Sequence, residues 1–222
     1  NQQEYSSKTI PFRRGDIVDR KGTVLATSTD VYNVILDCSV LTSREQYLEP
    51  TIAAMVQCFG VDETELRAYV SENPKKRYYK VMDKLPYEEI AQFEDLQNDE
   101  KNGKNIKGVW FEKEYIREHP YDTLASTLLG FTTGNVGIGG LEDYYNETLN
   151  GVDGKEYGYV NDDSNYEIKV KEAADGNTLV STIDANLQSI TENKIAEFNN
   201  AMKDGQNEGA KNIGVIMMDP NT

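Results

Sequence analysis

The residues of this chain that could do nucleophilic chemistry are not at the spacings that this chemistry needs. An acyl-serine enzyme with a lysine base places the two as S-x-x-K, on one face of a helix. No serine here has a lysine three positions later, and no K-[ST]-G stretch is present. The one S-x-N match, Ser71-Glu72-Asn73, precedes Pro74 and is typical of a helix end. We therefore expect no catalytic residue in these 222 residues.

The histidine and cysteine content does not indicate a metal or cofactor site. The single histidine, His119, has no nucleophile beside it, which favours a structural role over that of a catalytic base. Cys38 and Cys58 have no histidine partner in a metal-ligand spacing. They could form a disulfide in an extracytoplasmic domain or remain two buried free thiols, and we favour the thiols. The stretch Asp162-Asp163-Ser164-Asn165 lacks the glycine and final glutamate of an EF-hand and is expected to be a turn.

Charged side chains stand beside glycines in three separate stretches. Residues 13–26 predict two short strands joined by a turn at Lys21-Gly22. Residues 117–131 run from Arg-Glu-His-Pro-Tyr to Leu-Leu-Gly-Phe, and residues 137–154 run from Gly-Ile-Gly-Gly-Leu-Glu to Leu-Asn-Gly-Val-Asp-Gly. The glycines of the third stretch lack the Lys-Ser/Thr of a phosphate-binding loop, so a tight turn before a helix is the better interpretation.

Together the three stretches closely resemble the non-catalytic N-terminal region of class B penicillin-binding proteins, called the dimerisation or pedestal domain. That family carries R-G-x-I-x-D-R-x-G-x-x-L-A, then R-x-Y-P leading to L-G, then G-x-x-G-L-E leading to L-x-G-x-x-G. Residues 175–188 resemble the family's bridge into its transpeptidase domain, and residues 214–222 resemble the first strand of that domain. His119 stands where the family usually has tyrosine, which puts the local packing in question.

The resemblance implies a structural network of charges between the stretches. Carried over, Arg14, Asp19 and Arg20 would contact Glu142 and the region of Arg117. The alternative is a set of unrelated surface pairs, which contribute about 0–1 kcal/mol each. The residues that we assign to this network are Arg14, Gly15, Asp19, Arg20, Gly22, Arg117, Pro120, Gly140 and Glu142.

The chain is acidic, and its sequence has no stretch apolar enough to predict a transmembrane helix. The chain has 38 acidic and 23 basic residues and a net charge of −15, so it should repel nucleic acid and anionic lipid. No run approaches the ~18 apolar residues of a transmembrane helix. The resemblance implies an anchor helix before Asn1 that this chain lacks, and a location on the extracytoplasmic face of the bacterial cell membrane.

The order of elements predicts an α+β fold, an elongated β-rich stalk with an inserted helical head. Residues 10–37 are expected to be extended. In the head, Pro50 is expected in the first turn of a helix that Gly60 ends, Asp62 caps the next helix, and a strand covers residues 76–82. Pro86 then opens a helix, and residues 98–105 form a charged, mobile loop. Asp184 caps a last helix, whose apolar stripe is Leu187, Ile190, Ile195, Phe198 and Met202.

The expected domains are the stalk (residues 1–37 and 107–175), the head (38–106), and a linker with the start of a transpeptidase domain (176–222). The resemblance implies that the parent protein cross-links peptidoglycan as a serine-type D,D-transpeptidase. Its partners would be its own transpeptidase domain and a SEDS-family glycan polymerase or other division and elongation proteins. Two alternatives remain open: a stand-alone module that binds the cell wall or a partner protein, and the sensor domain of a β-lactam-responsive regulator.

Overall fold

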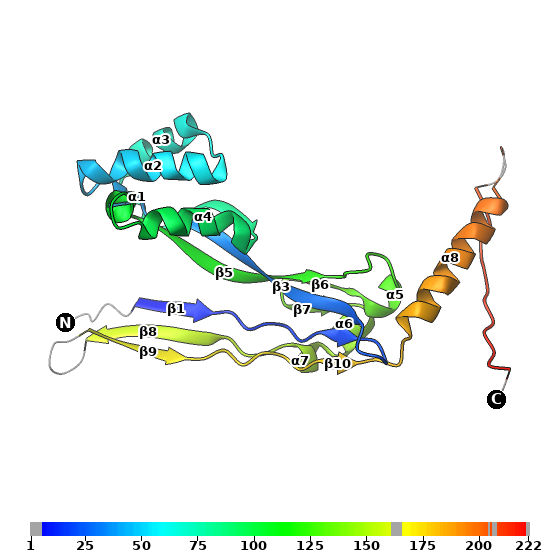
Figure 1. The fold of residues 1–222 in the computed structure, drawn as a ribbon. Helices are drawn as coiled ribbons and strands as arrows, with labels where there is room; N and C mark the ends of the chain where they lie inside the picture. Colours follow the sequence, from blue (N-terminus) through cyan, green and yellow to red (C-terminus); the bar gives the residue numbers. More distant parts are fainter. Residues whose placement is uncertain (1–5, 161–165, 204, 206–207, 221–222) are drawn as a thin grey trace. The chain divides into compact units, whose positions relative to one another are not determined.

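The computed structural model describes residues 6–160, 166–203, 205 and 208–220, and its mixed α+β fold confirms the predicted class (Figure 1). The turn expected at residues 162–165 lies outside these described residues. The strands are β1 (Ser6–Ile10), β2 (Ile17–Val18), β3 (Val24–Leu36), β4 (Tyr79–Leu85), β5 (Val109–Glu118), β6 (Phe131–Thr133), β7 (Val136–Ile138), β8 (Gly154–Val160), β9 (Tyr166–Lys171) and β10 (Leu179–Val180). The helices are α1 (Cys38–Leu41), α2 (Glu45–Phe59), α3 (Glu63–Glu72), α4 (Tyr87–Asn98), the 3₁₀ turn η1 (Gly103–Asn105), α5 (Ser126–Leu129), α6 (Gly140–Tyr144), α7 (Asn146–Leu149) and α8 (Ala185–Ala201).

The chain groups into two compact units, each assembled from three separate segments. Unit 1 holds residues 1–11, 29–116 and 153–173, and unit 2 holds residues 12–28, 117–152 and 174–222. The strands pair into a three-stranded sheet in the order β1-β8-β9, a sheet in the order β10-β2-β3-β4 with β5 also on β3, and the hairpin β6-β7. β10 runs parallel to β2, whereas β2 and β3 are antiparallel and are joined through Lys21-Gly22, as predicted.

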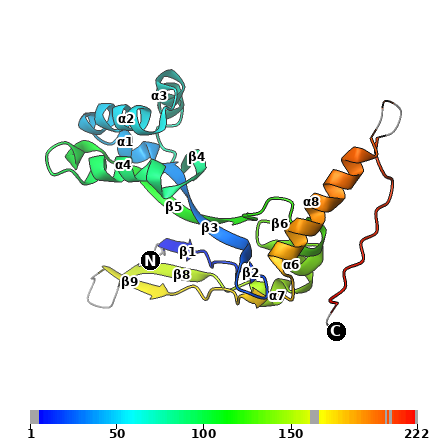
Figure 2. The same cartoon turned by 45° about the vertical axis from the view of Figure 1, so that its right-hand side comes forward.

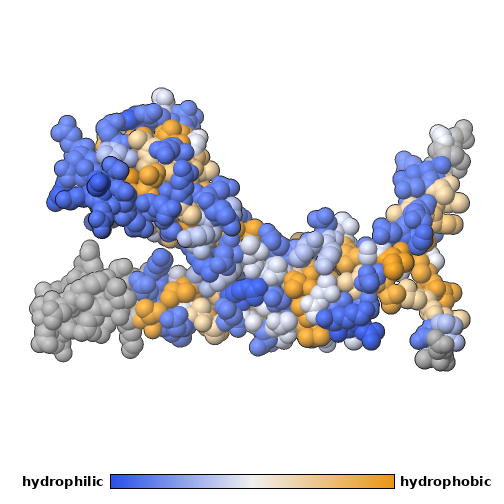
Figure 3. Space-filling view, viewed as in Figure 1, coloured by the Kyte–Doolittle hydropathy of each residue, from blue (hydrophilic) through white to orange (hydrophobic). Residues whose placement is uncertain are grey.

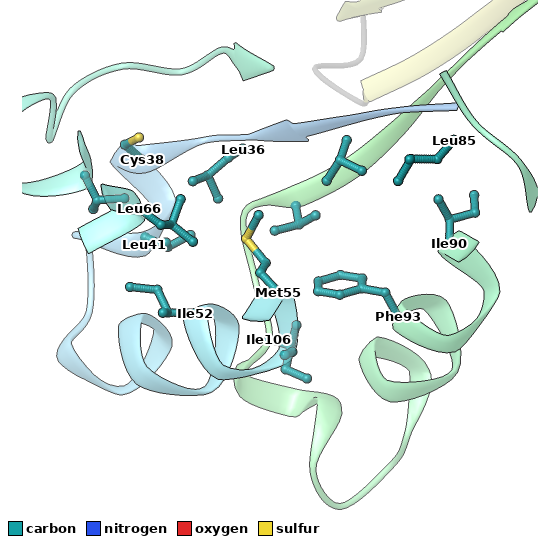
Figure 4. Packing of buried hydrophobic residues seen from close by; sticks show 14 residues of the cluster. Leu36, Cys38, Leu41, Ile52, Met55, Leu66, Leu85, Ile90, Phe93 and Ile106 are labelled. Atoms are coloured by element: carbon teal, nitrogen blue, oxygen red, sulfur yellow. The ribbon is translucent and has the colours of Figure 1, made fainter. Parts of the chain in front are cut away.

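The helical part of unit 1 has its own hydrophobic core (Figure 4). Ile52 and Met55 of α2 are fully buried, and Phe93 of α4 stacks on Phe59 with ring centroids 5.2 Å apart. Val34 and Val109 belong to the same core, so the ends of β3 and β5 contribute to it. The core contains the buried residues Val34, Leu36, Cys38, Leu41, Ile52, Ala54, Met55, Leu66, Val70, Leu85, Ile90, Phe93, Ile106 and Val109.

Several helix ends of unit 1 lie where the sequence predicted them. Gly60 ends α2 with a φ of 62°, a left-handed conformation that glycine adopts without steric cost. The Asp62 carboxylate accepts a 2.8 Å hydrogen bond from the Glu65 N–H at the start of α3. Pro86 precedes α4. The predicted strand at residues 76–82 is found slightly later, as β4.

Two features of unit 1 differ from the prediction. Pro50 lies inside α2 and not in its first turn, because the helix begins at Glu45. The residues before Pro50 are largely exposed, so water can bond the carbonyl that lacks a helical partner because proline has no N–H. The stretch 98–105, expected to be a loop, contains η1 and is held by the Asp99 carboxylate, which accepts hydrogen bonds from the N–H groups of Lys101 and Asn102.

Unit 2 is built around a second, smaller core. Its buried residues are Ile17, Leu25, Ala26, Leu124, Ala125, Leu129 and Leu149. Figure 2 labels β2, α6, α7 and α8 of this unit. Asp184 caps α8 as predicted, accepting hydrogen bonds from the Asn186 and Leu187 N–H groups. The apolar stripe of α8 is only partly covered, since Leu187, Ile190, Phe198 and Met202 are 46–55% exposed.

The strand expected near residues 214–222 is not present in the described part of this segment. Residues 212–219 have no regular secondary structure, and Val215, Ile216, Met217 and Met218 are 53–92% exposed. A strand needs a neighbouring strand for its backbone hydrogen bonds, and no strand pairs with these residues. Figure 3 shows apolar surface in the region of α8 and this segment.

Candidate functional site: a buried Arg-Glu-Arg network

The three charged stretches of the sequence meet inside unit 2, where two arginines hold one glutamate. The Arg14 Nε lies 2.8 Å from the Glu142 Oε2, and the Arg117 Nε lies 2.7 Å from the Glu142 Oε1. The side chains of Glu142, Arg14 and Arg117 are only 0%, 3% and 5% exposed. Each carboxylate oxygen therefore accepts from a different guanidinium, an arrangement typical of strong charge-assisted hydrogen bonds.

Neutral oxygen atoms satisfy most of the remaining guanidinium N–H groups. Arg14 donates to the side-chain oxygens of Asn150 at 2.6 Å and Asn146 at 2.9 Å, and to the Glu142 backbone carbonyl at 2.8 Å. Arg117 donates to the Gly15 carbonyl at 2.8 Å. The two arginines and one glutamate carry a formal charge of +1, and these oxygen dipoles stabilise the excess positive charge in the buried setting.

Glycines allow the backbones around the network to approach closely. A Cβ on Gly15 would lie 1.9 Å from the Asn177 carbonyl oxygen, and a Cβ on Gly140 would lie 2.3 Å from that of Leu128. Gly140 also has a φ of 58° at the start of α6, the helix that carries Glu142. A larger residue at either position would push apart the segments that the network joins.

Asp19 lies elsewhere and does not reach Glu142, so that part of the expected network is wrong. One Asp19 carboxylate oxygen accepts from the N–H groups of Lys21 and Thr23, both at 2.8 Å, and the other accepts from the Ala185 N–H at 3.1 Å. Burial raises the pKa of Asp19, but these hydrogen bonds outweigh that effect and lower its pKa to about 2. Asp19 thus closes its own turn and fixes the start of α8.

Three further residues of the expected network take no part in the Glu142 cluster. The Arg20 side chain is exposed, and its backbone N–H donates to the Ile183 carbonyl at 2.9 Å. Burying the Arg20 guanidinium as well would cost desolvation free energy, because the buried Glu142 carboxylate already has two guanidinium partners. Gly22 lies in the turn before β3, and Pro120 is exposed after β5.

His119 is half-buried next to this cluster. Within the described residues, its Nε2 and the Nη2 of Arg117 are buried without a hydrogen-bond partner. Burial lowers the pKa of His119, while Glu142 opposes and Arg117 reinforces that shift. Burial likewise lowers the pKa of the Arg117 guanidinium, against the attraction of Glu142. His119 therefore favours its neutral form in the folded state.

The sequence reasoning missed the neutral members of the network. Asn146 and Asn150 follow Glu142 at intervals of four residues, so their spacing offered a signal that they share a side with it. Asn146 also accepts from the Gly137 N–H at 2.9 Å and so ties β7 to the network. Ser28 gave no such signal; it donates to the Arg14 carbonyl at 3.1 Å and accepts from Arg117 at 3.2 Å.

The paired charges of this cluster support a structural role. Within the described residues, no group of three or more His, Cys, Asp or Glu side chains could hold a metal ion. Cys38 and Cys58 are both free thiols, the first buried and the second half-buried, and burial raises the pKa of each. A hydrogen-bonded ion cluster of this kind fixes the geometry of the segments that supply it.

The chain belongs to the family described as "Penicillin-binding Protein dimerisation domain", whose sequence profile matches residues 9–181. It is 28% identical over 202 residues to Stage V sporulation protein D of Bacillus subtilis, covering 85% of this chain and 29% of that protein. It is 30% identical over 151 residues to Peptidoglycan D,D-transpeptidase FtsI of Buchnera aphidicola, covering 65% of this chain and 24% of that protein. The chain thus spans less than a third of each of these relatives, and it is related to peptidoglycan transpeptidases.

The fold is also found among solved structures. Penicillin Binding Protein 2X from Streptococcus thermophilus matches with a TM-score of 0.72 at 24% identity, over 88% of this chain and 32% of that one. The complex between Penicillin-Binding Protein (PBP2) and MreC from Helicobacter pylori matches with a TM-score of 0.60 at 21% identity, over 89% of this chain and 39% of that one. These likenesses confirm the fold, and the family profile confirms the predicted family. Among the described residues, no helix has the length and apolar character needed to cross a membrane.

Proposed function

We propose that this chain is the non-catalytic pedestal of a class B penicillin-binding protein, and that its parent cross-links peptidoglycan as a serine-type D,D-transpeptidase. The observation that carries the proposal is the buried cluster of Arg14, Glu142 and Arg117, which joins the three motif stretches of the family. The pedestal belongs on the extracytoplasmic face of the membrane. There it supports the catalytic domain and contributes no reacting group.

The exposed apolar surface of the C-terminal part supports contact with a further domain. The family profile ends at residue 181, and α8 lies beyond that point with an apolar stripe about half exposed. The apolar residues 215–218 are exposed as well. In a water-soluble protein, such adjoining apolar surface marks an interaction site. We assign it to the parent's transpeptidase domain, which gives residues 176–222 the role of linker and first elements of that domain.

The pedestal also offers a surface to other proteins of cell-wall synthesis. PBP2 of Helicobacter pylori, which shares this fold, has been solved as a complex with MreC. This supports a partner among division or elongation proteins, and we keep a SEDS-family glycan polymerase as a candidate on the family resemblance alone. The helical head, residues 38–106, has a largely separate core and is a suitable element to contact such a partner.

Labelling with a fluorescent penicillin tests the proposal. The complete natural protein and this chain are incubated with the probe and run side by side on a denaturing gel. We expect a boiling-resistant band from the complete protein and none from this chain, since the chain lacks S-x-x-K. An unlabelled, folded complete protein would favour a stand-alone binding module. A labelled protein with no cross-linking activity would favour the β-lactam sensor.

A further inference from the structure

Unit 2 contains a second feature that the pedestal role does not use, a cavity of about 650 Å³ beside the first turns of α8. The loop after β5 forms one wall with Tyr121 and Asp122, and the β2–β3 turn forms another. The third wall is the α8 face that carries Asn186, Ser189 and Asn193. This volume lies within the range of small-molecule sites.

Hydrogen bonds and an ion pair hold the walls of the cavity in place. The Ala185 N–H at the start of α8 donates to Asp19, and Lys21 Nζ lies 2.8 Å from the Asp184 carboxylate. On the other side, the Ala125 N–H donates to Glu192 at 2.9 Å. Three of the carboxylates that line the cavity are therefore already occupied by N–H or ammonium groups. This arrangement indicates a formed site and argues against a cation as its ligand.

The side chains that remain available are neutral hydrogen-bonding groups and one aromatic ring. Asn186, Ser189 and Asn193 stand at positions i, i+3 and i+7, so they share one face of α8. Their side chains form no hydrogen bond within the described part of the chain, and each offers both donors and acceptors. Tyr121 lines the cavity and is 50% exposed.

We propose that this cavity binds a neutral sugar chain. Side-chain amides, a hydroxyl and the Asp122 carboxylate suit the alternating donors and acceptors of sugar hydroxyl and acetamido groups, and the Tyr121 ring offers a flat face to the C–H groups of a sugar ring. Asp19, Asp122, Asp184 and Glu192 against one lysine would repel an anionic ligand. The choice of an N-acetylated, β-1,4-linked glycan rests on the proposed function, since the sugar backbone of peptidoglycan, apart from its charged stem peptides, is of this class.

Calorimetric titration of this chain with chitotetraose, the β-1,4-linked tetramer of N-acetylglucosamine, tests the inference. We expect saturable binding that Tyr121→Ala weakens about tenfold, a change of the size expected when an aromatic contact and its buried area are lost. Asn193→Ala should also weaken it. Both side chains are exposed, so neither variant should unfold, which circular dichroism checks.

Tyr144→Ala is the matched control, because Tyr144 is 82% exposed in the same unit and does not line the cavity. We expect it to bind like the parent chain. Absence of saturable binding would overturn the sugar site, and so would an equal loss of affinity in Tyr144→Ala. Either result leaves the pedestal proposal standing, because penicillin labelling of the complete protein tests that separately.

Discussion

Glu142 has no contact with solvent, and its two carboxylate oxygens contact different guanidinium groups. Burying an ionised carboxylate costs several kcal/mol, and the two arginines offset this free energy only together with the amide and carbonyl oxygens around them. Removing one partner leaves the other charges buried away from water without their full set of partners. At the scale of residues, the cluster is therefore expected to behave as one unit, unlike the exposed ion pairs of the chain.

A double-mutant cycle of Arg14→Ala and Glu142→Ala measures that coupling. Each single variant should cost about 3–5 kcal/mol of unfolding free energy, and the double variant should cost less than the sum. Chemical denaturation of the four proteins gives the coupling energy. The control cycle is Arg67→Ala with Glu49→Ala, an exposed pair 2.7 Å apart in unit 1, for which we expect about 0–1 kcal/mol. Equal coupling in both cycles would contradict the buried role of Arg14.

His119 should make the folded state sensitive to mild acid. Its pKa is lower in the folded protein than the ordinary value of 6.5, so the unfolded chain takes up the proton first. The stability that neutral His119 contributes is fully present above pH about 6.5 and is lost as the pH falls toward the lower folded pKa.

Unfolding free energies between pH 5 and 8 test this, because no other histidine is present in the chain. His119→Gln should flatten the decline below pH about 6.5. An identical decline in the variant would assign the acid sensitivity to other groups.

Asp19 gives the opposite kind of titrating group, one with a lowered carboxyl pKa. Its folded pKa of about 2 lies below the ordinary 3.8, so its stabilising effect is present above pH 3.8 and is lost as the pH falls toward 2. Asp19→Asn should be less stable at neutral pH and should show a smaller loss of stability in that acid window. Acid titration followed by far-ultraviolet circular dichroism measures both. Parallel acid curves for the two proteins would show that Asp19 does not contribute.

At the scale of elements, positions with a strong local signal were predictable and positions that depend on distant partners were not. Asp62, Gly60 and Asp184 act on their own helix ends, and each was placed from the sequence. The predicted start of α2 at Pro50 was wrong. The buried residues after Pro50 decide where α2 packs, and the exposed turn before it tolerates the proline inside the helix. Residues 214–218 have strand composition, but the described chain provides no strand to pair with them.

The candidate site divides in the same way. The family motifs indicated that Arg14, Arg117 and Glu142 belong together, and the distances show that they are in contact. The motifs did not separate Asp19 from that cluster, because a carboxylate near two arginines in sequence can equally well close its own turn. Asn146 and Asn150 carry no charge and were not predicted as members of the site, although their side-chain oxygens accept hydrogen bonds from Arg14.

Two phenylalanines on helices separate the buried core from the partly covered stripe. Phe93 of α4 is fully buried, whereas Phe198 of α8 is 52% exposed. Phe93→Ala should cost about 3–5 kcal/mol, because it removes a core ring and leaves a cavity. Phe198→Ala should cost much less in this chain. Urea denaturation compares them, and a Phe198→Ala cost as large as that of Phe93→Ala would show that the α8 face is covered.

At the scale of the whole molecule, the described residues form two hydrophobic cores and one incompletely buried C-terminal part. Each compact unit draws on three separate stretches of sequence, so neither is a simple N- or C-terminal half. Unit 2 contains both the Arg-Glu-Arg cluster and α8, whose apolar stripe we assign to a transpeptidase domain. If the proposed transpeptidase domain is present, we expect damage to the cluster to affect how that domain is supported, and to leave its acylation chemistry intact.

The most direct test of this account is to measure penicillin acylation and peptidoglycan cross-linking in the complete natural protein carrying Arg14→Ala. Arg67→Ala, in the exposed pair of unit 1, is the control and should leave both unchanged. For a folded Arg14→Ala protein, the account predicts that fluorescent penicillin still labels the catalytic domain while cross-linking falls. Acylation lost together with cross-linking, or cross-linking unchanged in a protein proven to be destabilised, would contradict a structural role for this network in a peptidoglycan transpeptidase.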